Sequence, residues 1–298
     1  MDMNARPNRI HRAVGISCAP RPDGPLLDDL ARAGVACVEI SLPGAEYASF
    51  PYAECARRAR DAGVAVRSFH LPFYLTPADG PVDPASLDPE VRRRTAELHR
   101  RLLGVAADMG ARFAVVHACL EPVEDADRAA RLDASRESMA ALAEAGAALG
   151  MTVCVENLPR SCLGNTAAEL LSIVECDPRL RVCFDVNHLL LESHADFLRT
   201  AGHLIATLHI SDYDFVNERH WFPGEGKIDW VALADGLDDI GYADAFTYEL
   251  GFRGNPKIVA RSRDLTPADF VRNAREIEDR VPLTVIGDGG LPDLPMWP

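Results

Sequence analysis

The feature that most constrains the fold of this chain is the alternation of short apolar runs with longer amphipathic stretches. Each run is rich in β-branched or aromatic residues, is too short for a helix and is followed by a turn signal, which is typical of a buried strand. Eight such runs occur, at residues 13–19, 36–43, 65–73, 113–120, 152–158, 181–188, 205–212 and 245–251. Helical periodicity lies between them, at residues 25–34, 53–63, 89–111, 126–150, 166–176 and 229–241. The pattern predicts repeated strand–helix units.

Residues at the ends of the predicted helices support this interpretation. Asp88 precedes Pro89 as an expected N-cap, Thr166 precedes another helical stretch, and Gly63 and Gly110 stand near C-termini. Eight strand–helix units in 298 residues match one (β/α)8 TIM barrel. The alternative, a doubly wound open sheet, usually has a glycine-rich turn after its first strand, and residues 18–22 contain no glycine. We therefore predict a single TIM barrel domain over residues 1–298, with the glycine- and proline-rich residues 287–298 as a peripheral tail.

Composition excludes several functional classes. The formal net charge of −14 argues against nucleic acid as a partner, because phosphate neutralisation requires a basic surface. No apolar run is long enough for a transmembrane helix, and the first residues lack the apolar segment of a secretory signal. The eight cysteines are scattered, and Cys119, Cys154 and Cys183 fall inside predicted strands. They are interpreted as reduced core thiols, so we expect a cytoplasmic protein without a membrane partner.

Polar side chains stand at the C-terminal ends of four predicted strands. They are Glu156, Asp185, His209 and Glu249. A parallel barrel brings these ends together at the rim where TIM barrels carry their active sites. Three carboxylates in one mouth repel one another unless a cation neutralises them, and one imidazole with three carboxylates suits Mn²⁺, Co²⁺, Mg²⁺ or Zn²⁺. For any single residue a buried acid paired with an arginine is an equal alternative, but four coincident positions favour one divalent metal.

Further histidines lie near the same predicted mouth. His70 lies in the third strand, His117 in the fourth, His188 follows Asp185, and His220 is in the loop after the seventh strand. Together they would extend the metal site or bind substrate hydroxyls. Each one alone is also explained as a polar residue that holds a loop, and His117, within an apolar run, is most simply a core histidine.

Several segments together resemble a known group of enzymes. The sequences VENLPR, CFDVNH, TLHISDYD, RHWFPGEGKIDW and TYEL are similar to those of sugar isomerase and epimerase barrels of the xylose isomerase-like TIM barrel superfamily, which includes sugar phosphate isomerases, ketose 3-epimerases and endonuclease IV-type enzymes. The resemblance runs from the third strand to the eighth. It implies a metal-dependent isomerase or epimerase that acts on a sugar or a related polyhydroxy carbonyl compound. Phosphorylation of the substrate stays open.

The resemblance to the ketose epimerases also implies roles for individual residues. One metal would be held by Glu156, Asp185, His209 and Glu249. Glu156 and Glu249 would be the catalytic pair, one removing a proton α to a carbonyl and the other returning it, with the metal stabilising the enediolate. His188 would contact substrate oxygens. His220 stands where the epimerases usually have an arginine, although Arg219 is adjacent.

Two alternatives remain at this stage. The endonuclease IV-type enzymes use three zinc ions, and the corresponding positions here would be His188, Glu218 and His220 for one zinc, with His70 and His117 joining Glu156 on another. A hydrolase or lyase with two or three metals is therefore an alternative, although residues 72–79 and the net charge offer no basic groove for DNA. The second alternative is a non-catalytic sugar-binding barrel. Homo-oligomers are common among such barrels, and oligomeric state stays open here.

Overall fold

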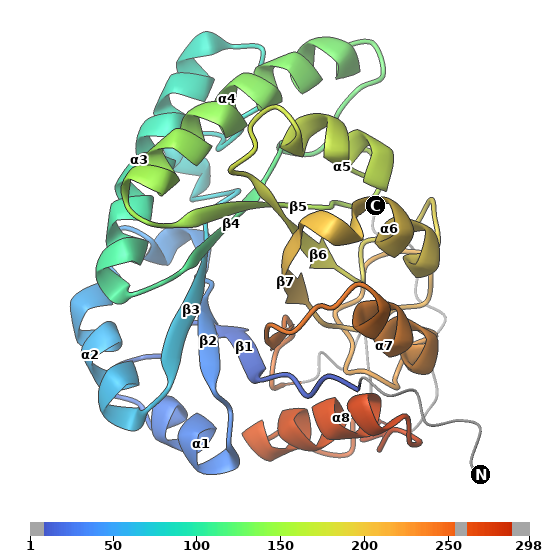
Figure 1. The fold of residues 1–298 in the computed structure, drawn as a ribbon. Coiled ribbons are helices and arrows are strands. Elements are labelled where there is room, and N and C mark those ends of the chain that lie inside the picture. The colour runs from blue at the N-terminus through green and yellow to red at the C-terminus, as the bar shows by residue number, and fades with distance from the viewer. Residues whose placement is uncertain (1–8, 254–260, 288–298) are drawn as a thin grey trace.

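The computed structural model describes residues 9–253 and 261–287, and within them eight strands alternate with eight α-helices around one barrel (Figure 1). The strands are β1 (Val14–Cys18), β2 (Cys37–Ile40), β3 (Ala65–His70), β4 (Phe113–His117), β5 (Thr152–Glu156), β6 (Arg181–Asp185), β7 (Ile205–His209) and β8 (Phe246–Tyr248). The helices are α1 (Leu26–Ala33), α2 (Tyr52–Ala62), α3 (Pro89–Met109), α4 (Arg128–Ala148), α5 (Ala167–Val174), α6 (His194–Ala201), α7 (Trp230–Asp239) and α8 (Pro267–Asp279). The predicted TIM barrel is confirmed. The predicted tail lies almost wholly outside the described residues.

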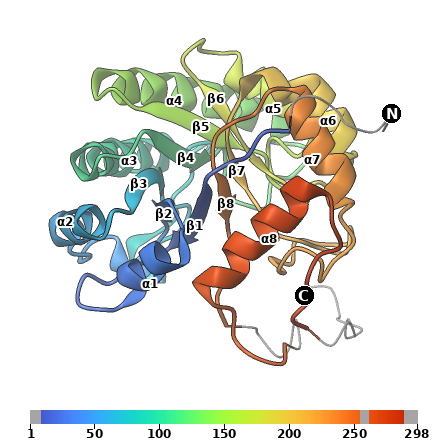
Figure 2. The same cartoon turned by 60° about the horizontal axis from the view of Figure 1, so that its bottom comes forward.

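All strand pairs are parallel, in the order β7-β6-β5-β4-β3-β2-β1-β8, and the helices form the outer ring (Figures 1 and 2). Strands β7 and β8 close the barrel through one parallel bridge between Ile210 and Tyr248. The backbone N–H of Ile210 donates to the carbonyl of Thr247 at 2.8 Å, and the N–H of Glu249 donates to the carbonyl of Ile210 at 3.1 Å. These bonds fix the end of β8, and therefore Glu249, beside the end of β7.

Local end signals explain most helix boundaries. The Asp88 side chain accepts from the Glu90 N–H and the Thr166 side chain from the Glu169 N–H, as predicted for N-caps. Gly63 and Gly110 adopt the left-handed conformation directly after α2 and α3. Two helices, α6 and α8, were not predicted. Each strand is also shorter than its apolar run, and apart from residues 13, 36 and 245 the remaining residues of the runs follow the strands at the C-terminal rim.

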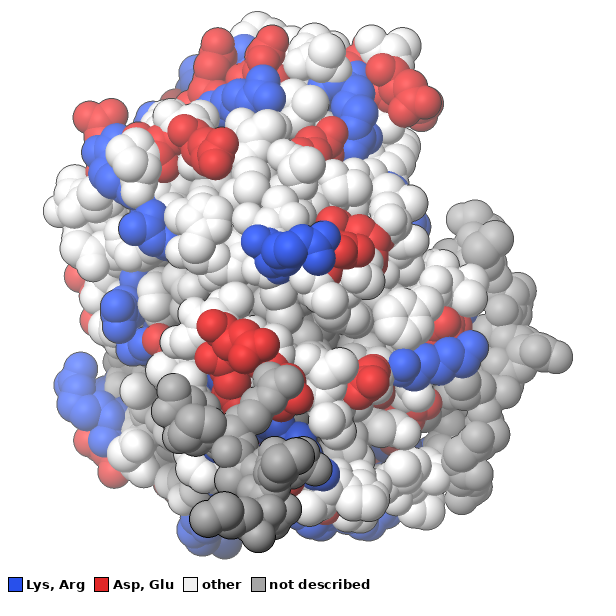
Figure 3. Space-filling view, turned by 45° about the vertical axis from the view of Figure 1, so that its right-hand side comes forward, with Lys and Arg blue, Asp and Glu red and all other residues white. Residues whose placement is uncertain are grey.

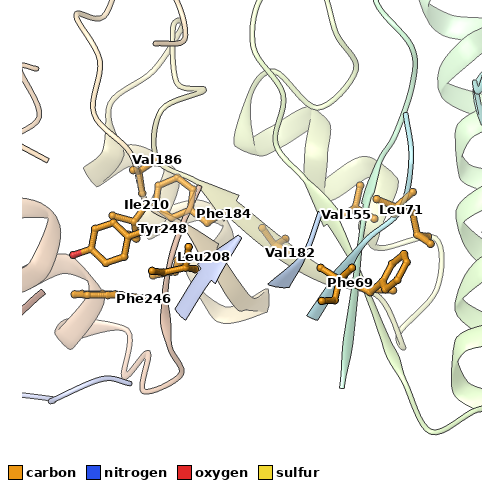
Figure 4. Packing of buried hydrophobic residues seen from close by; sticks show 14 of the residues in the cluster. Phe69, Leu71, Val155, Val182, Phe184, Val186, Leu208, Ile210, Phe246 and Tyr248 are labelled. Carbon is orange, nitrogen blue, oxygen red and sulfur yellow. The ribbon is translucent and has the colours of Figure 1, made fainter. Parts of the chain in front are cut away.

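Side chains alternate along each strand between the helix layer and the barrel interior. The outward set is apolar and packs in one large core against the helices, as Figure 4 shows for Phe184, Leu208 and Tyr248. The inward set contains a small apolar cluster of Phe113, Val115, Cys154 and Cys183. The next inward positions of β5 and β6 are Glu156 and Asp185, which lie at the rim. The period of two therefore places polar groups on the interior side of strands whose other side is fully apolar.

The surface and the cysteines agree with the composition. On the described part of the face in Figure 3, basic side chains are interspersed with acidic ones. No helix in the described part of the chain is long and apolar enough to cross a bilayer. All eight cysteines are free thiols, and burial raises the pKa of Cys37 to about 12. Six of them are buried, as expected for core thiols, but Cys18 is only half-buried and Cys176 is exposed, so the core interpretation is wrong for Cys176.

Candidate active site and metal centre

The C-terminal ends of four neighbouring strands bring together the predicted metal ligands. Glu156, Asp185, His209 and Glu249 each present one ligand atom, and these four atoms lie within 4.8 Å of one another. His209 Nδ1 lies 3.0 Å from Glu156 Oε1, 3.3 Å from Glu249 Oε2 and 3.8 Å from Asp185 Oδ2. The first three residues are buried and Glu249 is partly exposed. One nitrogen and three carboxylates at this spacing form a donor set for a divalent cation.

Glu156 is surrounded by imidazoles. Its Oε2 atom lies 3.2 Å from His70 Nε2 and 3.2 Å from His117 Nε2, and its Oε1 atom accepts from His209 Nδ1 at 3.0 Å. Burial alone would raise the pKa of Glu156, but His209 and the hydrogen bonds from the other two histidines hold that pKa well below its ordinary range. The residue is therefore an ionised carboxylate at the centre of the site. His117, for which a core role was the simplest interpretation, borders the cavity and contacts this carboxylate.

Asp185 carries an oxygen without a partner. Its Oδ1 atom accepts from the Asn187 N–H at 2.6 Å, but Oδ2 is buried and has no hydrogen-bond partner among the described residues. Burial raises the pKa of Asp185 to about 7, although His188 opposes the rise. Buried carboxylate oxygens are rarely left unpaired, because the desolvation is costly. An oxygen orphaned inside this donor set fits a divalent cation.

A second group of possible ligands lies beside the first. His188, Glu218 and His220 present ligand atoms within 4.8 Å of one another. His188 Nδ1 donates to the carbonyl of Asn157 at 2.9 Å, which leaves Nε2 facing Glu218 Oε2 at 3.1 Å and Asp185 Oδ2 at 3.6 Å. Burial alone would lower the pKa of His188, but Asp185 and Glu218 raise it to about 10. The structure brings together the three residues that the alternative with several metals requires, and their role as ligands stays a prediction.

The loop that carries Glu218 and His220 is anchored by the Pro-Gly-Glu-Gly turn. The Asp212 carboxylate accepts from the N–H groups of Gly224 and Ile228 and from the indole N–H of Trp230, at 2.8–3.1 Å. A Cβ at Gly226 would lie 2.2 Å from Asp212 Oδ1, so only glycine fits there. Backbone bonds between Asp212 and Trp221 then form the base of a hairpin. The turn is therefore structural and presents the hairpin tip to the mouth.

A cavity of about 350 Å³ opens over these groups. Its lining consists of Phe73, Tyr74, His117, Cys119, Leu120, Glu121, Glu156, Leu158, Pro159, Arg160, Cys162, His188, Glu218, His220 and Glu249. The volume lies within the range of small-molecule sites. Arg160, the single arginine or lysine among these lining residues, pairs with Glu121 at 2.7 Å and with Glu218 at 2.9 Å. It thereby joins three rim loops.

Aromatic residues of the loops at the C-terminal rim fall into two sets. Phe73 and Tyr74 line the cavity, and the Phe73 ring stacks on His117 with centroids 4.2 Å apart. Tyr213, Trp221 and Phe222 are buried in the protein interior instead. Arg219 is not among the described lining residues of the cavity, because its guanidinium pairs with Asp214 at 2.8 Å and lies over the Trp221 ring.

Glu39 was missed by the sequence analysis. It lies in β2, is fully buried and accepts from His209 Nε2 at 2.9 Å. The available signal was a lone acid within the apolar run CVEI. Such an acid is as often paired structurally as it is functional, so the run alone did not single it out.

Residues 27–268 match the xylose isomerase-like TIM barrel family. The chain belongs to this family. The resemblance noted from the sequence is therefore confirmed at the level of the family.

Individual relatives are sugar epimerases or are uncharacterized. An uncharacterized protein of Methanocaldococcus jannaschii is 27% identical over 71% of this chain and 73% of its own length. The L-ribulose 3-epimerase of Mesorhizobium japonicum is 30% identical over 65% of this chain and 64% of that enzyme, slightly less than two thirds of its length. A solved structure of an L-ribulose 3-epimerase superposes with a TM-score of 0.66 at 27% identity, covering 80% of this chain and 81% of that one. The two relatives with a named activity are therefore sugar epimerases.

Proposed function

We propose that the protein is a divalent-metal-dependent epimerase or isomerase of a ketose or a related polyhydroxy carbonyl compound. The observation that carries the proposal is the pair Glu156 and Glu249, which line one cavity and share a four-residue donor set with Asp185 and His209. The similarity to an L-ribulose 3-epimerase supports this class of reaction.

The two glutamates approach the cavity from different strands of the ring. Glu156 ends β5 and Glu249 follows β8, and these strands are separated by β6 and β7 on one side and by four strands on the other. Epimerisation removes a proton from one face of a carbon and returns one to the opposite face, so two bases on different sides of a bound substrate are what it needs. Glu156 and Glu249 would exchange the roles of base and acid with the direction of the reaction.

The donor set fits Mn²⁺, Co²⁺, Mg²⁺ or Zn²⁺, because it contains one imidazole and three carboxylates and no thiolate. Glu156, Asp185, His209 and Glu249 would hold the ion. A bound divalent cation supplies the positive charge that stabilises the enediolate oxygens. The apolar wall that includes Phe73 and Leu158 would exclude water from the carbon that loses its proton.

The test is conversion of free sugars by metal-loaded protein. The protein is stripped with a chelator, reloaded with Mn²⁺, Co²⁺, Mg²⁺ or Zn²⁺, and incubated with L-ribulose and other ketopentoses and ketohexoses in D₂O. The proposal expects an epimer or isomer that carries deuterium at the reacting carbon, in a metal-dependent manner. Binding without conversion for the whole panel would favour a sugar-binding barrel instead.

The second candidate function is a metallohydrolase or lyase with two or three metals. It is favoured by the group His188, Glu218 and His220, which lies next to the first donor set, and by the contacts of His70 and His117 with Glu156. Elemental analysis distinguishes the two. A mononuclear epimerase holds one metal per chain, and His220→Ala leaves that content unchanged. A multinuclear site holds two or three, and the same substitution removes one.

A further inference from the structure

Glu39 and His209 lie on opposite sides of the barrel interior and are joined by a hydrogen bond of 2.9 Å between Glu39 Oε1 and His209 Nε2. Glu39 belongs to β2 and His209 to β7. Both side chains are fully buried. A buried carboxylate is retained only where enough donors replace its lost water, so the donors of Glu39 show what the residue does.

Two of the donors to Glu39 are serines at the same height of the barrel, on the strands to either side. Ser17 is in register with Glu39, and Glu39 is in register with Ser68, on the adjacent strands β1, β2 and β3. The Ser17 hydroxyl donates to Glu39 Oε1 at 3.0 Å and the Ser68 hydroxyl donates to Oε2 at 2.8 Å. The two serines therefore hold the carboxylate in place, and neither neutralises its charge.

The remaining donor, His209, faces a carboxylate with each of its ring nitrogens, so both nitrogens donate until a cation replaces the proton on Nδ1. An ionised carboxylate only accepts, so the bond to Glu39 requires a proton on His209 Nε2. The other ring nitrogen, Nδ1, faces Glu156 at 3.0 Å and Glu249 at 3.3 Å. Nδ1 is therefore the nitrogen that points into the donor set.

We propose that Glu39 is a positioning residue of the metal centre, which fixes the ring orientation and tautomer of His209 and increases the basicity of Nδ1. The inference rests on the proposed function, because it requires His209 to be a ligand. Carboxylate partners of metal-bound histidines act in this way, and removal of such a partner lowers metal affinity about 10–100-fold. Glu39 does not line the cavity, so it acts through His209 and not on the substrate.

The test measures metal affinity in Glu39→Gln, which keeps the shape and removes the charge. Zn²⁺ and Mn²⁺ affinities are determined by competition with a chromophoric chelator, and long-range ¹H–¹⁵N spectra of the zinc-loaded protein report which His209 nitrogen binds zinc. We expect affinity to fall roughly 10–100-fold and zinc binding through Nδ1 to be no longer exclusive. Glu278→Gln is the matched control, because Glu278 is also fully buried but accepts from Arg12 and Arg275 and belongs to none of the candidate ligand groups.

The outcomes separate this inference from the proposed function. Glu39→Gln with an affinity within about twofold of the wild type overturns the positioning role while leaving the proposed function intact. Wild-type protein that binds no divalent metal overturns both. If Glu39→Gln does not fold, the double variant Ser17→Ala, Ser68→Ala decides. It keeps the carboxylate and removes its two hydroxyl donors, so weaker metal binding supports the role and unchanged binding contradicts it.

Discussion

Asp185 Oδ2 lies 3.8 Å from His209 Nδ1 and 3.6 Å from His188 Nε2, yet it accepts no hydrogen bond from any residue that the structure describes. The metal-free protein therefore contains a buried carboxylate oxygen that only a cation or a proton would satisfy. An unpaired buried charge of this kind lowers the stability of the metal-free fold, and the same charge attracts a cation to the site.

Asp185→Asn is expected to stabilise the metal-free protein and to abolish metal binding. Because the asparagine is neutral, the substitution removes an uncompensated charge, and we expect a rise in Tm of about 2–5 °C at pH 8. Metal affinity is expected to fall at least about 100-fold, since a ligand oxygen and its charge are lost. Differential scanning fluorimetry with and without metal measures both effects. Asp177→Asn is the control and should lower Tm instead, because Asp177 accepts a hydrogen bond from Arg179 at 2.6 Å and the substitution weakens this ion pair.

Metal affinity is expected to rise with pH. The pKa of Asp185 is raised to about 7 by burial, and the pKa of His209 is raised well above its ordinary value by the neighbouring carboxylates against its burial. Protons therefore compete with the metal at neutral pH, and each proton displaced contributes up to a tenfold change in apparent affinity for each pH unit below its pKa. Chelator competition at pH 6, 7 and 8 measures the slope. An affinity that does not change over this range would contradict Asp185 and His209 as ligands.

Phe73→Ala is expected to weaken substrate binding more than turnover. The Phe73 ring lines the cavity and stacks on His117, but Phe73 is not one of the four donors. Loss of one aromatic wall should weaken the free energy of substrate binding by roughly 1–2 kcal/mol. KM should therefore rise about 5–30-fold, while kcat changes less than about threefold. Steady-state kinetics on the best substrate provides the measurement. Leu191→Ala, at a site 63% exposed and outside the cavity lining, serves as the neutral control.

Asp269→Asn is expected to destabilise the fold without affecting the metal site. Asp269 is buried in the first turn of α8, where it accepts from the Thr266 N–H and from Arg263. Burial alone would raise its pKa, but these hydrogen bonds lower it below its ordinary value. Ionised Asp269 therefore contributes fully to the free energy of unfolding above pH about 4, the pKa of an aspartate in the unfolded chain. This contribution is lost as pH falls from there toward the lower pKa of the folded state. Urea unfolding should show a loss of about 2 kcal/mol at pH 7 that shrinks at pH 3.

The control for that prediction is a second capping box. The Asp79 side chain bonds the Thr76 N–H in the same way at the short 3-10 helix Pro77–Asp79, but Asp79 is exposed. Asp79→Asn should have a much smaller effect on the unfolding midpoint. Equal effects of the two substitutions would show that burial of Asp269 is not what makes its cap important.

The sequence predicted the part of the site that depends on local pattern. Glu156, Asp185 and His209 each lie near the C-terminal end of an apolar run, and parallel strands must bring such ends together, so their convergence followed from the strand–helix pattern. The contacts of Arg160 with Glu121 and Glu218 were not predictable, because they join loops whose paths depend on non-local packing. Glu39 was missed for a related reason. Its partner His209 is 170 positions away, and only the register of the closed barrel places the two opposite each other.

The most direct test of the central claim is deuterium exchange in Glu156→Gln and Glu249→Gln, each loaded with metal and checked for metal content. If the two glutamates are the acid/base pair, each variant loses epimerisation by at least about 10³-fold, because one face of the carbon has no proton donor or acceptor. Each variant should still exchange the proton of one epimer with D₂O, and the two variants should act on opposite epimers. Metal-loaded variants that both epimerise at the wild-type rate would contradict the account.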